Sequence, residues 1–186
     1  MKRKHALVIG GTGVLTDVSL WLADNGYVVS VIGRNKSKHE NMRAKSQYPG
    51  LINSLMVDYR DHALLENLVT NAIDSYGPIT LVISWTPSLG SLELINRIVC
   101  EKSQSWKLFQ VMGSRRYFEE NKLEVPYGCH HRRIYLGFIR EGNQSRWLMN
   151  NEIAGGVIKS VEEDHSESII GVSIHMKNVQ IIRGIR

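Results

Sequence analysis

The sequence is poor in cysteine, in proline and in long apolar runs, and each shortage excludes a class of protein. Only two of its 186 residues are cysteines and only four are prolines. Cys100 and Cys129 are too few and too far apart for a disulfide framework or a four-ligand zinc site, and in a reducing cytoplasm they would remain thiols. No apolar run approaches the roughly 20 residues of a membrane helix. We therefore expect a cytoplasmic protein that does not span a membrane.

The charge is modest and confined to one part of the chain. Lys and Arg exceed Asp and Glu by 23 to 18, and the whole excess of five lies in residues 1–50, because residues 51–186 hold fifteen of each sign. A nucleic-acid-binding protein usually masses basic residues with aromatic ones along a stripe, or carries a reading motif, and neither is present. We therefore expect no nucleic-acid partner. Part of the excess, at Arg34, Lys36 and Lys38, could face a small anionic ligand instead.

Apolar runs of strand length alternate with helix-like segments along most of the chain. Residues 5–10, 27–33, 51–57, 80–85 and 106–112 read as strands, and residues 14–24, 36–47, 61–76 and 91–101 read as the helices between them. After a polar stretch at 113–130 come a strand at 132–139, a helix at 149–163 and a strand at 168–175, with 179–185 as an edge strand or a tail. Such alternation predicts an α/β doubly wound parallel sheet, a Rossmann fold with three αβα layers. The length favours one domain over residues 1–186.

The turn after the first strand reads Gly10-Gly11-Thr12-Gly13-Val14-Leu15-Thr16 and leads into a helix. Glycines allow a positive φ there and let backbone N–H groups approach a pyrophosphate at the positive end of the helix. The last glycine of the usual dinucleotide pattern is replaced by Thr16, which affects helix packing rather than phosphate contact. The turn therefore predicts a dinucleotide site. A turn that keeps its glycines for packing alone is the other interpretation.

The end of the second strand decides between two dinucleotides. An acid there binds the ribose of NAD, whereas a basic residue favours the 2′-phosphate of NADP. The segment Gly33-Arg34-Asn35-Lys36 has no acid, and the fork of Arg34 suits a phosphate. We therefore expect NADP rather than NAD, with an ordinary surface arginine as the alternative.

Two further strand ends complete the expected site, because ligands bind beyond the carboxyl ends of parallel strands. Asp58, followed by Tyr59, could accept from an adenine amino group or cap the helix beginning near His62, a role that Asp61 would fill better. After the fourth strand, Trp85 is either a core aromatic or a wall of the nicotinamide pocket. The expected cofactor-binding residues are Gly10, Thr12, Gly13, Val14, Leu15, Arg34, Asn35, Asp58, Tyr59, Ser84, Trp85 and Thr86.

With these residues placed, the sequence resembles the short-chain dehydrogenase/reductase superfamily, in particular its short, atypical bacterial members, with some similarity to NmrA-like proteins. The resemblance is strong over residues 4–34, moderate to about residue 114 and weak beyond. It implies NAD(P) binding, hydride transfer and a homo-oligomer. Its usual Asn-Asn-Ala-Gly run is absent at residues 84–86.

The resemblance also implies a catalytic serine at the end of the fifth strand and a Tyr-x-x-x-Lys pair on the next helix. Ser114 matches the serine, but no tyrosine in the chain is followed by lysine four residues later, and residues 114–131 are too short for the family's long substrate-side helix. Tyr127 or His130 is a weaker candidate proton donor. We expect no metal at Cys129, His130 and His131, because adjacent histidines point apart in a strand. The sequence thus predicts an NADP-binding oxidoreductase of unidentified substrate, with a non-catalytic NAD(P) sensor as the alternative.

Overall fold

The computed structural model describes residues 3–113, 115–116, 123–172 and 180–182, the last three through their backbone alone. Its principal strands are β1 (His5–Ile9), β2 (Val28–Gly33), β3 (Ile52–Met56), β4 (Ile79–Ser84), β5 (Trp106–Gly113), β6 (Cys129–Leu136), β9 (Glu167–Ile170) and β10 (Gln180–Ile182). The α-helices are α1 (Thr16–Asp24), α2 (Lys36–Lys45), α3 (His62–Tyr76), α4 (Leu89–Lys102) and α5 (Asn150–Glu163), and Pro49–Leu51 forms the short 3₁₀ turn η1.

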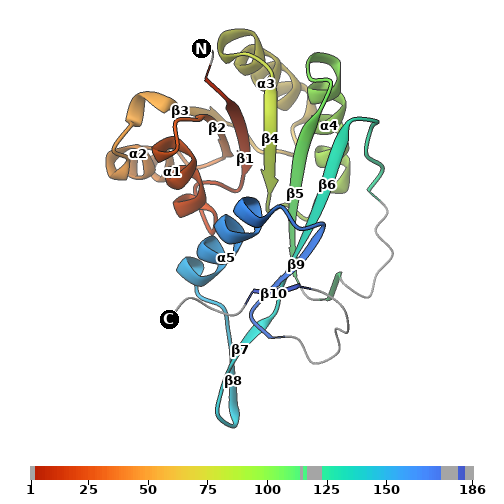
Figure 1. The fold of residues 1–186 in the computed structure, drawn as a ribbon. Helices are drawn as coiled ribbons and strands as arrows, with labels where there is room; N and C mark the ends of the chain where they lie inside the picture. The colour runs from red at the N-terminus through yellow and green to blue at the C-terminus, as the bar shows by residue number, and fades with distance from the viewer. Residues whose placement is uncertain (1–2, 114, 117–122, 173–179, 183–186) are drawn as a thin grey trace.

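Eight strands form one sheet in the order β10-β9-β6-β5-β4-β1-β2-β3, and every pair in it is parallel. Helices cover both faces (Figure 1). One apolar layer joins α1, α2 and α5 to the sheet, and the other joins α3 and α4 to it. The expected doubly wound α/β fold is confirmed.

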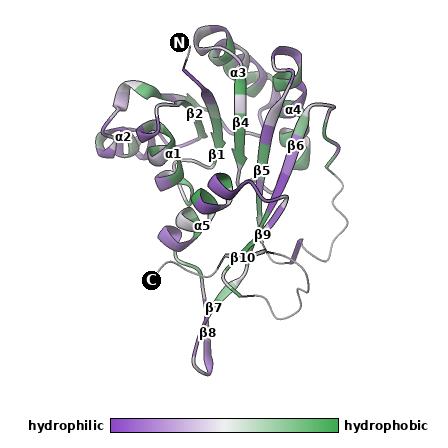
Figure 2. Cartoon of the chain, viewed as in Figure 1, coloured by the Kyte–Doolittle hydropathy of each residue, from purple (hydrophilic) through white to green (hydrophobic). Residues whose placement is uncertain are grey.

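Burial explains why the central strands read as continuous apolar runs. Ala6, Leu7, Val8 and Ile9 of β1 all have no exposed surface, because helices cover the strand from both sides. Figure 2 shows the hydrophobic residues gathered in the middle of the sheet and the hydrophilic ones on the outer helix surfaces. Among the described residues, no helix is both long enough and apolar enough to cross a membrane.

The second half of the chain departs from the sequence prediction. The strand expected at 132–139 begins earlier, at Cys129, and stops at Leu136. Beyond it, β7 (Phe138–Glu141) and β8 (Gln144–Trp147) form a separate antiparallel hairpin that the sequence analysis missed, projecting below the sheet in Figure 1. Its turn contains Gly142 at φ 60°.

The chain's last strands are also parallel. β9 ends at Ile170, earlier than expected, and residues 173–175 of the expected strand lie outside the described residues. Residues 180–182 pair with β9, so the edge-strand interpretation of 179–185 is confirmed for those three residues.

Candidate functional site

The glycine turn lies where β1 ends, next to the end of β4. Gly10 has φ 82°, and a Cβ there would lie 3.1 Å from the backbone oxygen of Trp85. Its N–H donates to the oxygen of Ile32 at 3.3 Å. Both the positive φ and the close approach of Trp85 disfavour any side chain at this position. Gly10 therefore lets the turn cross the ends of β2 and β4 closely.

Helix α1 begins without a side-chain cap, because its N-cap position is held by Leu15, which is fully buried. Within the described part of the chain, no hydrogen bond engages the backbone N–H groups of Thr12, Val14 and Leu15. Gly13 is exposed, and a Cβ there would have only the Gly10 oxygen nearby, at 3.6 Å. The start of α1 thus combines uncommitted donors with the positive end of a helix dipole, which is the environment that anions prefer.

The close helix packing that the missing third glycine would provide is supplied by Gly11. A Cβ on Gly11 would lie 2.5 Å from Ser19 Oγ and 2.7 Å from Val31 Cγ1. Thr16, in the place of the third glycine, instead donates its hydroxyl to the Gly13 oxygen at 2.7 Å. The sequence analysis did not assign this role to Gly11, although the small residue Ser19 on the facing turn of α1 was an available signal.

Thr12 connects the turn to the end of β2. A Cβ on Gly33 would lie 2.6 Å from Thr12 Oγ1, so the threonine side chain occupies the space above that glycine. From α2, Nε2 of the buried His39 lies 3.1 Å from the Gly33 oxygen. Burial lowers the pKa of His39 and the bond to Gly33 only partly opposes this, so the neutral ring is favoured near pH 7. The sequence analysis did not single out His39.

Arg34 and Asp58, at the ends of β2 and β3, form an ion pair that the sequence analysis did not predict. Arg34 Nη1 lies 3.3 Å from Asp58 Oδ2, and the arginine side chain is 70% exposed. Asp58 also accepts the backbone N–H of Arg60 at 3.0 Å. That bond, together with the Arg34 charge, lowers the pKa of Asp58 below its ordinary value. Asp61, as expected, caps α3 by accepting from Leu64 N.

Two other expected residues have local structural roles in this region. Asn35 is the N-cap of α2, with its side-chain oxygen accepting the Lys38 N–H at 3.0 Å. Tyr59 is half-buried and carries the Arg60 guanidinium 5.8 Å from its ring centre. Both residues flank the Arg34 and Asp58 pair, but their polar or ring surfaces already have partners.

The end of β4 lies beside the glycine turn. Ser84 is fully buried, and its hydroxyl has no partner among the described residues. Trp85 is half-buried, and its side chain packs against Gly10. Its backbone N–H donates to the Ile9 backbone oxygen at 3.0 Å. Its side chain also contacts the apolar layer under α1. Trp85 therefore packs as a core aromatic and also lies against Gly10 of the turn. Thr86 accepts from Ser88 N at 3.2 Å.

Of the two candidate catalytic residues, the structure places only Tyr127, and Tyr127 lies away from this group. Ser114 lies outside the described residues, directly after β5. Tyr127 is fully exposed and precedes the start of β6, which pairs with the start of β5 at Trp106. In a parallel sheet this is the edge opposite the glycine turn, so Tyr127 cannot reach a ligand held there. His130, also at the start of β6, is excluded for the same reason.

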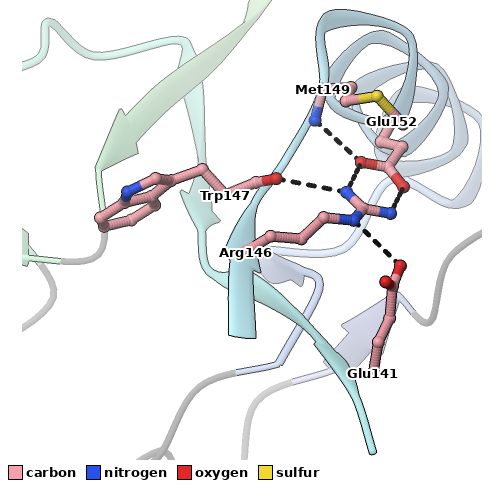
Figure 3. Close-up of polar contacts among 5 residues, drawn as sticks. All are labelled: Glu141, Arg146, Trp147, Met149 and Glu152. Atoms are coloured by element: carbon pink, nitrogen blue, oxygen red, sulfur yellow. Dashed lines mark hydrogen bonds and ion pairs between the residues drawn. The ribbon is translucent and has the colours of Figure 1, made fainter. Parts of the chain in front are cut away.

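The hairpin is fixed to α5 by a cluster of ion pairs that the sequence analysis missed (Figure 3). Arg146 donates to both carboxylate oxygens of Glu152, at 2.8 and 2.9 Å, and to Glu141 at 2.9 Å. Glu152 also accepts the backbone N–H of Met149, the N-cap residue of α5, at 2.8 Å. The bonds from Arg146 hold the pKa of Glu152 at about 2. Trp147 pairs across the hairpin with Phe138 and is 77% exposed.

No group of three or more histidine, cysteine or acidic side chains in the described residues is arranged to hold a metal. No family model matches the chain, and no curated protein matches it.

Solved structures do match. A short chain dehydrogenase from Bacillus anthracis superposes with a TM-score of 0.73 at 15% identity, over 95% of this chain and 98% of that one. The actinorhodin polyketide ketoreductase with NADPH superposes with a TM-score of 0.68 at 13% identity, over 91% of this chain and 95% of that one. A short-chain dehydrogenase from Streptomyces avermitilis superposes with a TM-score of 0.64 at 12% identity, over 92% of this chain and 89% of that one.

Proposed function

Because this chain has the fold of the short-chain dehydrogenase/reductase structures, we propose that it binds NADP(H) and acts as an oxidoreductase. Its residues do not identify the substrate. The observation that carries the proposal is the contact of Arg34 with Asp58, beyond a glycine turn that leads into an uncapped helix. One of the structural neighbours was solved with NADPH, which supports a dinucleotide for this fold.

The pyrophosphate fits the start of α1. The free N–H groups of Thr12, Val14 and Leu15 would donate to its oxygens, and the helix dipole adds a favourable field. The side chain of Leu15 is buried, so this residue would act only through its backbone. Gly13 has open space above it, which would let the phosphates approach the backbone closely.

The adenosine end fits the corner of β2 and β3. Arg34 is exposed, and among the described residues only Nη1 of its guanidinium has a partner, so the remaining N–H groups could bind a 2′-phosphate on two atoms. Asp58 Oδ1 and Oδ2 already accept from Arg60 and Arg34, and the carboxylate keeps lone pairs for an adenine amino group. With an arginine and no acid after β2, the corner favours NADP over NAD.

The nicotinamide end would lie past β4 and β5, where Trp85 would form a wall and Ser114 would contact the substrate. The bound nicotinamide supplies or accepts the hydride. Because the sequence has no Tyr-x-x-x-Lys pair and Tyr127 lies at the opposite edge, these residues offer no standard proton donor. That observation favours a second candidate, a sensor that binds NADP(H) without turnover and changes its partners or its oligomeric state.

The experiment that tests the proposal is a calorimetric titration of the protein with NADPH and with NADH. We expect micromolar NADPH binding and much weaker NADH binding. Arg34→Ala should weaken NADPH about 10-fold to 100-fold, the value of a charge-assisted contact, and leave NADH within about twofold. Arg34→Lys, which keeps the charge without the fork, should recover only part of the loss.

Two further variants separate the contributions. Lys36→Ala removes a neighbouring exposed charge and should change NADPH affinity little, so an equal loss in both variants would mean that general charge, not the Arg34 fork, attracts the cofactor. Gly13→Val places its side chain in exposed space rather than in the core, so the protein should still fold. The added side chain should prevent the binding of both NADPH and NADH. Unchanged binding in Gly13→Val would rule out the turn as the phosphate site. Turnover across a panel of carbonyl compounds then distinguishes the oxidoreductase from the sensor.

A further inference from the structure

A second site candidate lies at the other edge of the sheet, where β4, β5 and β6 begin. A groove of 470 Å³ opens there between the strand starts, the segment before β1 and the end of α5. Figure 2 shows that the beginnings of β5 and β6 are hydrophilic, unlike the middle of the sheet. We call this the basic groove, and the side chains on which its chemistry depends are those of Lys4, Tyr27, Lys107, His130, Arg132 and Asp164.

Positive charge predominates in the basic groove. Lys4, Lys107 and Arg132 line it together with one carboxylate, that of Asp164. Asp164 accepts from Lys107 Nζ at 2.7 Å and from Arg132 Nε at 3.0 Å. Burial raises the pKa of Asp164, but the two hydrogen bonds together with the charges of Arg132 and Lys107 lower it by more, so the pKa lies below its ordinary value and the carboxyl is ionised near pH 7. One carboxylate and three cations leave an excess of two positive charges.

Several donors in the basic groove have no partner in the described residues. The two terminal nitrogens of Arg132 and the ammonium of Lys4 make no hydrogen bond, although Lys4 Nζ lies 5.8 Å from the centre of the Tyr27 ring. Lys107 uses one of its three donors, on Asp164. His130 Nε2 is engaged with Ser105 Oγ at 3.1 Å. An incoming anion would therefore meet donors that are already oriented but not satisfied.

Asp164 adopts a backbone conformation that directs it into the groove at some cost. It ends α5 with φ 54° and ψ 34°, and among the described residues it is the one non-glycine residue with a positive φ. Aspartate tolerates this left-handed conformation better than most residues, yet glycine is the usual choice at a helix end. A carboxylate at this point orders Lys107 and Arg132 side by side along the groove wall.

From this arrangement we propose that the basic groove binds a small organic phosphate monoester. A phosphate monoester carries about −1.5 to −2 charges near pH 7, which matches the excess of two, whereas a single carboxylate would leave part of it uncompensated. The guanidinium of Arg132 offers two parallel N–H groups to phosphate oxygens. Leu81 and Val161 provide apolar walls for the organic part, and the volume lies within the range of about 300–1,000 Å³ that is usual for ligand pockets.

This site is separate from the proposed NADP(H) site and does not depend on it. The basic groove includes Lys4, just before β1, whereas the glycine turn follows Ile9 at the other end of that strand. Five residues of strand correspond to roughly 16 Å. A ligand in the groove therefore lies well away from the proposed cofactor site, and its binding is measurable without NADP(H).

The experiment is a titration of the full chain with phenyl phosphate. Binding is measured by calorimetry and by the NMR chemical-shift changes of backbone amides, and phenol serves as the uncharged control. We expect saturable binding of phenyl phosphate, shifts centred on residues 105–107 and 130–132, and none for phenol. Arg132→Gln should weaken binding about tenfold or more, and Lys4→Gln about threefold. Asp164→Asn should tighten it about threefold, because the substitution removes a like charge, frees both cations and keeps a side chain that tolerates the backbone conformation.

Two control variants decide where the phosphate binds. Arg97→Gln removes an exposed arginine that pairs with Glu66 between α3 and α4, and it should leave binding unchanged. Arg34→Ala should also leave it unchanged, because Arg34 belongs to the glycine-turn edge. Absence of binding to the unsubstituted protein, an equal loss in Arg97→Gln, or a loss in Arg34→Ala but not in Arg132→Gln would each overturn the proposal. Lys4→Gln and Asp164→Asn keep the proposal testable if Arg132→Gln does not fold, since Lys4 makes no ion pair within the described residues and asparagine tolerates the backbone conformation of Asp164.

Discussion

Gly11 and Gly13 stand two residues apart in the same turn, yet a methyl group should have opposite effects at the two positions. On Gly11 the added Cβ would lie 2.5 Å from Ser19 Oγ, 2.7 Å from Val31 Cγ1 and 3.0 Å from Val8 Cγ1. All three neighbours are buried between α1 and the sheet, so none has free space into which to move. On Gly13 the nearest atom would be 3.6 Å away, an ordinary contact.

The expected magnitude follows from this crowding. Overpacking a well-filled core costs about 1–3 kcal/mol, and in a chain of this length each kcal/mol lowers Tm by about 2–4 °C. Gly11→Ala should therefore lower Tm by roughly 2–12 °C. Gly13→Ala should be neutral or stabilising by up to about 1 kcal/mol, because alanine restricts the unfolded chain.

Thermal unfolding measures Tm and urea unfolding measures the free energy of unfolding; both are monitored by tryptophan fluorescence and by circular dichroism, which together test for a two-state transition. Adding Ser19→Ala to Gly11→Ala should recover part of the loss, since the closest clash goes but Val31 remains at 2.7 Å. If Gly11→Ala were as stable as the unsubstituted protein, or if both alanine variants lost the same stability, the account of Gly11 as the packing glycine would be refuted.

Three other expectations concern titratable groups. Glu152→Gln should destabilise the protein at pH 7, and its loss of stability should shrink as the pH falls from about 4.5 to about 2. The reason is that the ion pairs of Glu152 stabilise the fold only while the carboxyl is ionised. Urea unfolding across that pH range measures this. Burial and the charges of Arg133 and Arg132 hold the pKa of His131 at about 4. The contribution of the neutral ring to the free energy of unfolding is therefore full above pH 6.5 and is lost as the pH falls towards 4. His131→Gln should make the free energy of unfolding depend less on pH between those values. Burial raises the pKa of the Cys129 thiol to about 11, so a thiol reagent at pH 8 should modify exposed Cys100 first, and Cys100→Ser should remove the fast phase.

The first half of the fold could be predicted because its signals are local. Residues 5–113 alternate between short β-branched runs and helices with apolar stripes, and each run is long enough to mark its element to within a few residues. Asp61 was expected to cap α3 and does so. The second half carries weaker signals, since the four-residue strands β7 and β8 are too short for periodicity to mark them.

The candidate site divides in the same way. Arg34 and Asp58 could both be assigned to one ligand site from sequence, because ligands bind beyond the carboxyl ends of parallel strands, but the ion pair between them was not predicted. Tyr127 was a candidate because residues 127–131 gather a tyrosine, a cysteine and two histidines within five positions. The start of β6 lies only two residues beyond it, so the intervening loop has already returned to the opposite edge.

The sequence by itself determined the order of strands and helices over residues 5–113, the parallel sheet and the corner with arginine but no acid, because these depend on residue types at short spacing. Tertiary structure alone decided that Gly11 takes the packing role, that Arg146 joins the hairpin to α5, and that Lys4, Lys107 and Arg132 share one groove. The physical reason is that each of these contacts joins segments from different elements. Their distance in space depends on how strands pair and helices pack, and spacing along the chain does not encode it.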